Sequence, residues 1–135
     1  MTTRAELSRI QSARDGHTRL MRAALNGETD LVRNILACGA DVNARDHEGR
    51  TALMFAIINS HTNTVMELLR QNVDVNARAA DGTTALMLAT ISGDTEIVRT
   101  LLKNGASTSG MTALKLARER GFDEIVNLLQ AADAN

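Results

Sequence analysis

One phrase returns along the chain at a fixed interval, and it constrains the fold more than any other feature. The phrase GRTALMFA begins at Gly49, and GTTALMLA begins 33 residues later, at Gly82. Gly16 lies 33 residues before Gly49, and a related phrase, GMTALKLA, begins at Gly110. A fixed period of this length is typical of stacked supersecondary units, none of which can bury its apolar face alone. The period therefore predicts a solenoid of stacked units.

Each unit is predicted to contain two short helices, so the expected fold class is all-α. An N-cap threonine precedes each first helix, because its hydroxyl can accept a hydrogen bond from a first-turn amide; these are Thr18, Thr51, Thr84 and Thr112. A small turn and a second helix rich in Val, Ile and Leu follow. The second helices are expected to end at residues that tolerate the left-handed conformation; these are Gly39, Asn72 and Gly105.

The composition limits what such a solenoid can do. The chain has 135 residues, which suits one domain, and a net charge of −1, which favours neither nucleic acid nor an anionic membrane. Cys38 is its only cysteine, so the sequence predicts no intrachain disulfide and is typical of a reducing compartment. We find no secretion signal and no apolar run of membrane-spanning length. The expectation is a cytoplasmic protein.

These repeats resemble the ankyrin repeat family over about residues 13–130. The shared pattern is a glycine, a Thr-x-Leu-x-x-Ala phrase, an apolar second helix, and a Gly-Ala-Asp-Val-Asn phrase such as the one that begins at Gly39. The resemblance implies helix-turn-helix units with finger loops, closed by polar ends. The predicted divisions are a capping helix at 1–14, repeats at 15–45, 46–78 and 79–109, and a C-terminal capping repeat at 110–135. The TALM wording is closer to bacterial members of the family.

Three departures from the family pattern carry predictions. The usual histidine of the phrase is replaced by Met21, Met54, Met87 and Lys115, so its hydrogen bonds between repeats must be missing or rerouted. Polar residues in the second unit, from Ser60 to Thr64, predict that this repeat is the softest. The connection before Thr112 is five residues short. Either a finger loop is truly shortened there, or the sequence omits a segment near Ser107; the match of both flanks to the family pattern favours the omission.

We find little sign of catalytic or metal chemistry. A zinc site at His17 and His47, with Asp46 and Glu48 nearby, lacks four convergent ligands, so solvated tip residues are the better interpretation. Cys38 has no histidine near it in the sequence, and a catalytic thiol needs one. Carboxylate pairs such as Asp94 and Glu96 occur at second-helix starts, where the helix dipole favours them. We predict no cofactor and no enzyme; a hydrolase or redox protein using Cys38 or the histidines is the alternative.

The resemblance implies that finger tips and the concave, exposed face of the first helices bind another protein. The residues predicted to bind it are Arg14, His17, Arg45, His47, Glu48, Arg50, Ile58, Asn59, Arg78, Asp81, Thr83, Ile91, Ser92 and Met111. Ile58 and Ile91 occupy matching positions, where they either pack between neighbouring helices or form an exposed strip. Arg50→Ala or Ile58→Asp is expected to weaken binding and to leave the fold intact. The predicted function is a monomeric, non-catalytic interaction module that inhibits or protects an enzyme.

Overall fold

The computed structural model describes residues 17–108 and 112–133. In these ranges the chain forms helices and no strand, so the all-α prediction is confirmed. The helices are α2 (Arg19–Leu25), α3 (Thr29–Ala37), α4 (Ala52–Ile58), α5 (Thr62–Leu69), α6 (Ala85–Ser92), α7 (Thr95–Lys103), α8 (Thr112–Glu119) and α9 (Asp123–Asp133). The capping helix predicted at 1–14 lies outside the described residues, as do Arg14 and Met111, which are predicted to bind a partner.

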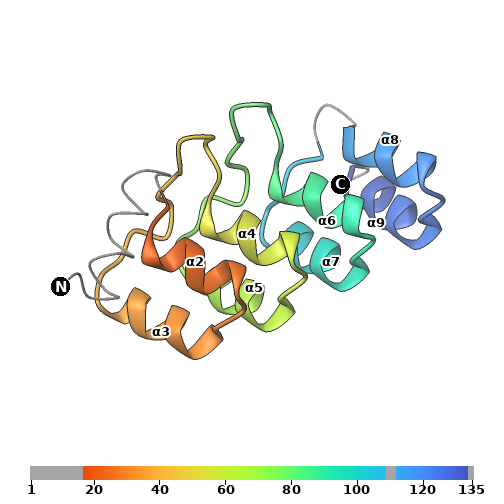
Figure 1. Ribbon diagram of the computed structural model, residues 1–135. Helices are drawn as coiled ribbons and strands as arrows, with labels where there is room; N and C mark the ends of the chain where they lie inside the picture. Colours follow the sequence, from red (N-terminus) through yellow and green to blue (C-terminus); the bar gives the residue numbers. More distant parts are fainter. Residues whose placement is uncertain (1–16, 109–111, 134–135) are drawn as a thin grey trace.

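The helices form four antiparallel pairs, stacked side by side (Figure 1). The first helices α2, α4, α6 and α8 pack successively on one another, and the second helices α3, α5, α7 and α9 form a parallel layer beneath them. The connections before α4 and α6 rise above both layers as finger loops (Figure 1). Each pair falls within one predicted repeat. The shortened connection crosses residues 109–111, outside the described part, so the choice between a short loop and an omitted segment stays open.

Threonine N-caps fix the starts of three first helices, as the sequence predicts. The hydroxyls of Thr18, Thr51 and Thr84 accept hydrogen bonds from the backbone N–H groups three residues later, at 3.1, 3.4 and 3.3 Å. At the first cap the Met21 sulfur also accepts from the Thr18 N–H, at 3.4 Å. The methionine that replaces the family's histidine therefore completes the cap within its own repeat. Thr112 differs from the prediction, because it is the first residue of α8 rather than a cap before it.

The turn inside each helix pair requires a residue with positive φ. Gly27, Gly93 and Gly121 provide it, with φ between 71° and 72°. The second repeat places Ser60 at this position, with φ of 55°, and Ser60 is the one non-glycine residue with positive φ in the described residues. A side chain destabilises this conformation because its Cβ crowds the backbone. The second repeat therefore contains a local strain that the other turns avoid.

The prediction that Asn72 ends the second helix in the left-handed conformation is wrong. Gly39 and Gly105 have φ of 92° and 91°, but Asn72 does not have positive φ. In the first and third repeats the chain closes with bonds from Ala40 N–H to the Ile35 carbonyl and from Ala106 N–H to the Leu101 carbonyl. In the second repeat α5 ends earlier, and the Val73 N–H donates to the Gln71 carbonyl instead. The penalty for a non-glycine residue at positive φ explains why this helix ends differently.

The core is one continuous apolar seam between the two helix layers. Val32, Val65 and Val98, which stand at matching positions of α3, α5 and α7, have no exposed surface. The first helix α4 is buried from Ala52 to Ile57, and its last residue, Ile58, is exposed. No repeat closes its own core, because these residues contact the preceding and following units. This arrangement leaves the finger loops and the helix ends free for contact with other molecules.

Candidate functional site

The predicted binding residues separate into two groups in the structure. One group lies on the finger loops, which we define as the first finger (residues 41–50) and the second finger (residues 74–83). His17 belongs to this group because it contacts Asp46 of the first finger. The other lies at the C-terminal ends of α4 and α6 and consists of Ile58, Asn59, Ile91 and Ser92. A first helix of this length separates the groups by about 10 Å. They are therefore two neighbouring patches rather than one row.

A buried carboxylate organises the first finger. The side chain of Asp46 has no exposed surface, and its oxygens accept hydrogen bonds from the backbone N–H groups of Glu48 and Arg50, at 3.0 and 2.7 Å. The Arg50 guanidinium donates to the same carboxylate at 2.8 Å and lies 5.0 Å above the Phe55 ring. His17 meets the carboxylate at 3.2 Å and packs edge-on against Phe55, with ring centroids 5.2 Å apart. The tip is thus held in one shape.

The pKa of Asp46 reflects two opposing influences. Burial raises the pKa of this carboxyl, but hydrogen bonds from the Arg50 backbone and guanidinium, with the charge of Arg50 and the Glu48 N–H, lower it below its ordinary value. The carboxylate is therefore ionised near neutral pH. Arg50 is accordingly a structural residue as well as a predicted partner contact. We therefore expect Arg50→Ala to destabilise the first finger as well as weaken binding, because it leaves the buried Asp46 carboxylate with fewer hydrogen-bond donors.

The two fingers are joined by main-chain and side-chain hydrogen bonds. The Arg45 guanidinium donates to the Gly49 carbonyl of its own finger, at 3.2 Å, and to the Arg78 carbonyl of the second finger. The Ala80 N–H donates to the Glu48 carbonyl at 2.8 Å. Arg45 therefore joins the two fingers, in addition to its predicted role in partner binding. His47 and Glu48 remain exposed at the tip, as do Arg78 and Asp81 on the second finger, and Thr83 is half-buried.

Asparagine side chains join the bases of neighbouring fingers. The Asn43 amide donates to the Asn72 carbonyl at 3.1 Å and accepts from the Asp74 N–H at 2.7 Å. Asn76 repeats both bonds one unit later, to the Gly105 carbonyl at 3.1 Å and from the Ser107 N–H at 2.7 Å. Each asparagine thus provides a hydrogen-bond partner for one backbone carbonyl and one backbone N–H of the next repeat.

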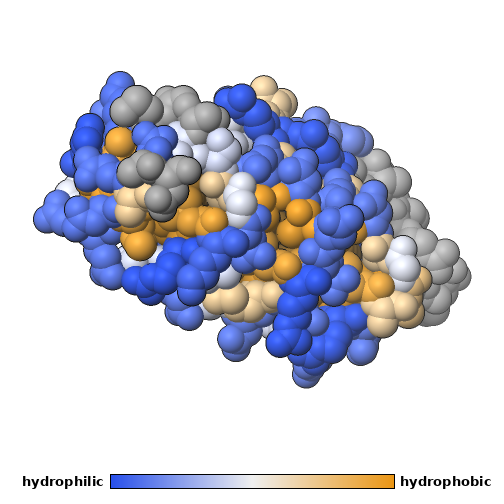
Figure 2. All heavy atoms as spheres, turned by 180° about the vertical axis from the view of Figure 1, so that it is seen from behind, coloured by the Kyte–Doolittle hydropathy of each residue, from blue (hydrophilic) through white to orange (hydrophobic). Residues whose placement is uncertain are grey.

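The second patch contains the two large apolar side chains that are exposed in the described residues. Ile58 is 42 % exposed and Ile91 is 39 % exposed, at equivalent positions of adjacent helices. Both side chains are thus exposed, whereas Leu25, one repeat earlier, packs partly against the core. Asn59 is less free, because its amide donates to the Leu25 carbonyl at 2.8 Å. Figure 2 shows the molecule from behind, where apolar patches are interrupted by hydrophilic side chains.

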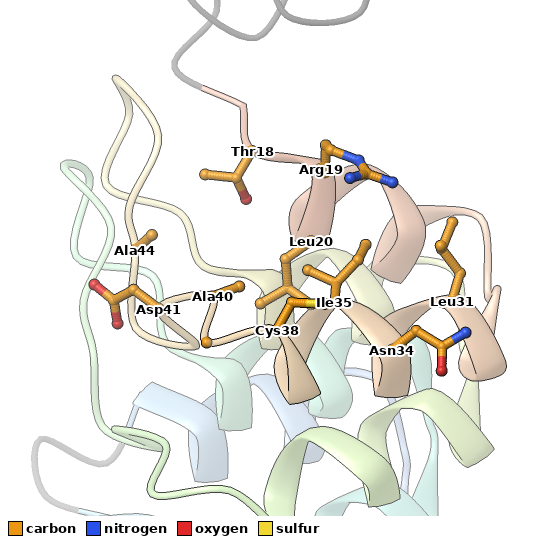
Figure 3. A pocket seen from close by; sticks show the side chains of 11 residues that line it. Thr18, Arg19, Leu20, Leu31, Asn34, Ile35, Cys38, Ala40, Asp41 and Ala44 are labelled. Carbon is orange, nitrogen blue, oxygen red and sulfur yellow. The ribbon is translucent and has the colours of Figure 1, made fainter. Parts of the chain in front are cut away.

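A third feature, an apolar hollow at the N-terminal end of the stack, was not identified from the sequence. It has a volume of about 570 Å³ and lies between α2, α3 and the loop that follows α3 (Figure 3). Leu20, Ile35 and Cys38 come together in it. No histidine is among its lining residues. The sequence predicts a cap from residues 1–14 at this end, and those residues are not described.

The described residues offer no assembled catalytic or metal centre. Cys38 is exposed at the end of α3, and no group of three or more His, Cys, Asp and Glu side chains within 17–108 and 112–133 could hold a metal ion. His17 is committed to Asp46, and His47 is exposed. No helix in the same ranges is long and apolar enough to cross a membrane.

Comparison with known proteins agrees with the stacked helix pairs. The family model for ankyrin repeats, in three copies, matches residues 20–109 and again residues 71–135. The chain belongs to the ankyrin repeat family. Ankyrin repeats are in general modules for protein–protein interaction, and the family is typically non-catalytic. Among curated proteins no match is found.

Sequence reasoning missed the cluster around Asp46, although a signal was present. The second finger has alanine at the equivalent position, Ala79, and Phe55 is one of two aromatic residues in the chain. An acid four residues before an arginine, next to a rare aromatic ring, indicates a local ion pair. The apolar hollow had no such signal, because its residues follow the same repeat pattern as core residues elsewhere.

Proposed function

We propose that the chain is a non-catalytic binding module that holds a partner protein against Ile58 and Ile91, with the finger residues as a polar rim. The observation that carries the proposal is the exposure of these two large apolar side chains at equivalent positions, whereas Leu25, the matching residue of the first repeat, packs partly against the core. Exposed apolar groups surrounded by polar residues mark protein contacts. The partner would present an apolar surface there.

The rim supplies charges of both signs. Glu48, His47, Arg78 and Asp81 are exposed on the fingers and are available for hydrogen bonds at the edge of the contact. The first finger is held rigid by Asp46, so its tip loses little conformational entropy on binding. A non-catalytic module of this kind acts by covering part of its partner. We propose an inhibitor or protective partner of an enzyme, working as a cytoplasmic monomer.

The test is affinity capture from a lysate of the source organism with three baits. The wild-type chain is compared with Ile58→Asp/Ile91→Asp and with Asn63→Asp, which adds one charge at an exposed position of α5, in the same repeat as Ile58 but in the other helix layer. We expect a protein retained by the wild type and by Asn63→Asp and lost with the isoleucine variant. Equal retention by all three baits would exclude this patch as the contact.

A further inference from the structure

The second patch belongs to first helices that lie side by side. The helices α4, α6 and α8 pack successively on one another (Figure 1). Ile58 and Ile91 occupy equivalent positions of α4 and α6, so the distance between them follows the spacing of packed helices, about 8–10 Å. Leu88, one turn before Ile91 on the same face of α6, is half-buried and extends the apolar surface toward the fingers. A partner must therefore present apolar groups with this spacing.

The backbone beneath the second patch offers no edge for main-chain pairing. In α4 and α6 the backbone N–H groups beyond the first turn are bonded within the helix. The Asn59 amide, next to Ile58, is occupied with the Leu25 carbonyl at 2.8 Å. An extended segment binds by pairing its main chain with an open edge, and the two helices have none. Recognition at the second patch therefore depends on side chains.

The spacing of the two isoleucines matches a partner helix better than a partner strand. In an α-helix, residues i and i+7 lie on nearly the same face, about 10.5 Å apart along the axis. In a strand, the residues on one face recur at about 6.7 and 13 Å, so no pair has the required spacing. A helix that crosses α4 and α6 can thus place residue i on Ile58 and residue i+7 on Ile91.

The charge of this surface changes where it continues onto α8. The residues that follow the isoleucines in the chain, Asn59 and Ser92, are uncharged. The equivalent part of the fourth repeat carries three exposed cations and one exposed anion, namely Lys115, Arg118, Arg120 and Glu119. None of these four side chains forms an ion pair or a hydrogen bond within residues 17–108 and 112–133. The α8 end of the surface is therefore positive and has charges available for a partner.

We propose that the partner docks an amphipathic α-helix across the first helices, neutral over α4 and α6 and acidic over α8. The inference rests on the proposed function and names the element of the partner that covers the second patch. Apolar residues of this helix, seven apart, cover Ile58 and Ile91. Its carboxylates, one to two turns further along, lie over residues 115–120. These exposed charges add little affinity, but they fix which end of the partner helix lies over α8.

The test uses two displayed libraries, with the whole chain as the target. One library randomises the exposed face of a single helix in a stable helical scaffold, and the other displays random linear peptides. Both are selected on the wild-type chain with counter-selection on Ile58→Asp/Ile91→Asp, so the retained binders depend on the second patch. Their Kd is then measured with the wild type, with Arg120→Glu, and with the control Lys103→Glu, which reverses an exposed cation of α7 in the other helix layer.

We expect the helical library to yield binders with apolar residues seven apart and Asp or Glu one to two turns beyond them. Their Kd should rise about three- to tenfold in Arg120→Glu, because an attractive pair becomes a repulsive one. The Kd should also rise with salt, since exposed ion pairs are screened. Lys103→Glu should bind as the wild type does.

Two results would overturn the inference and leave the proposed function standing. One is isoleucine-dependent binders from the linear library alone, and the other is helical binders whose Kd is the same in Arg120→Glu and in the wild type. Failure of both libraries to yield isoleucine-dependent binders would overturn the proposed function as well. Helical circular dichroism verifies folding, and Lys115→Glu, a second reversal on α8, decides the matter if Arg120→Glu disturbs the fold.

Discussion

Replacing Ser60 by glycine is expected to stabilise the chain. Ser60 has φ of 55° in a turn where the other repeats have glycine. The left-handed conformation costs a non-glycine residue about 1–2 kcal/mol, and the extra freedom that glycine has in the unfolded chain returns about 0.4–1 kcal/mol. The difference predicts a gain of about 0.5–1 kcal/mol, or a rise in Tm of about 2–5 °C.

Three matched variants separate the backbone effect from side-chain effects. Ser60→Ala should change little, because the Ser60 hydroxyl forms no hydrogen bond in the described part of the chain. Gly121→Ser imposes the same conformation on a side chain with open space around it, so it should destabilise by a similar amount. Gly93→Ser should destabilise more, because a Cβ there would lie 3.0 Å from the Phe122 ring.

Urea unfolding followed by circular dichroism measures these differences as shifts in the midpoint. The order expected from most to least stable is Ser60→Gly, wild type with Ser60→Ala, Gly121→Ser, and Gly93→Ser. A Ser60→Gly variant that is no more stable than the wild type would refute the strain argument. So would a Gly121→Ser variant that is unchanged.

The remaining predictions concern the fingers and the second repeat. Arg50→Ala should destabilise by about 1–2 kcal/mol in urea unfolding, because Asp46 stays buried with fewer donors. The pKa of Asp46 is lowered in the folded state, so its ionised carboxylate stabilises the fold above the ordinary carboxyl pKa of about 4. This stabilisation is lost as the pH falls through the pKa of the folded state. The free energy of unfolding should therefore fall in acid, and it should fall less steeply in Arg50→Ala. Asn43→Ala removes two bonds between units and should cost about 1–2 kcal/mol in the same assay, whereas an unchanged midpoint would contradict the bridging role. The second repeat remains predicted to be the softest: amides of α5 should exchange with deuterium faster than those of α7, and slower exchange would contradict this.

The sequence predicts the fold well because the same capping, turn and core residues recur in successive repeats. Thr18, Thr51 and Thr84 are caps, glycine marks the turns of three repeats, and the valines of α3, α5 and α7 are buried. The caps and turns depend on local backbone conformation, and the buried positions depend on the period of a helix. Both can be recognised in the sequence of a single repeat. Agreement between units then identifies the positions that the stack buries.

The site is less predictable because it depends on differences between units. Asp46, Arg50 and Phe55 meet only after the finger folds back over α4, and nothing in the repeat pattern requires it. Asn72 shows the same limit, since tolerance of the left-handed conformation does not force a residue into it. The exposure of Ile58 and Ile91 rather than Leu25 was decided by packing between helices, so the sequence left both alternatives open.

The central claim is that a partner protein covers Ile58 and Ile91. The most direct test is calorimetric titration of the captured partner into the wild type, Ile58→Asp/Ile91→Asp and Asn63→Asp. We predict a negative heat-capacity change for the wild type, as apolar burial requires, and a Kd about a hundredfold higher for the isoleucine variant. Asn63→Asp should match the wild type. An isoleucine variant that binds with the wild-type Kd would contradict the account.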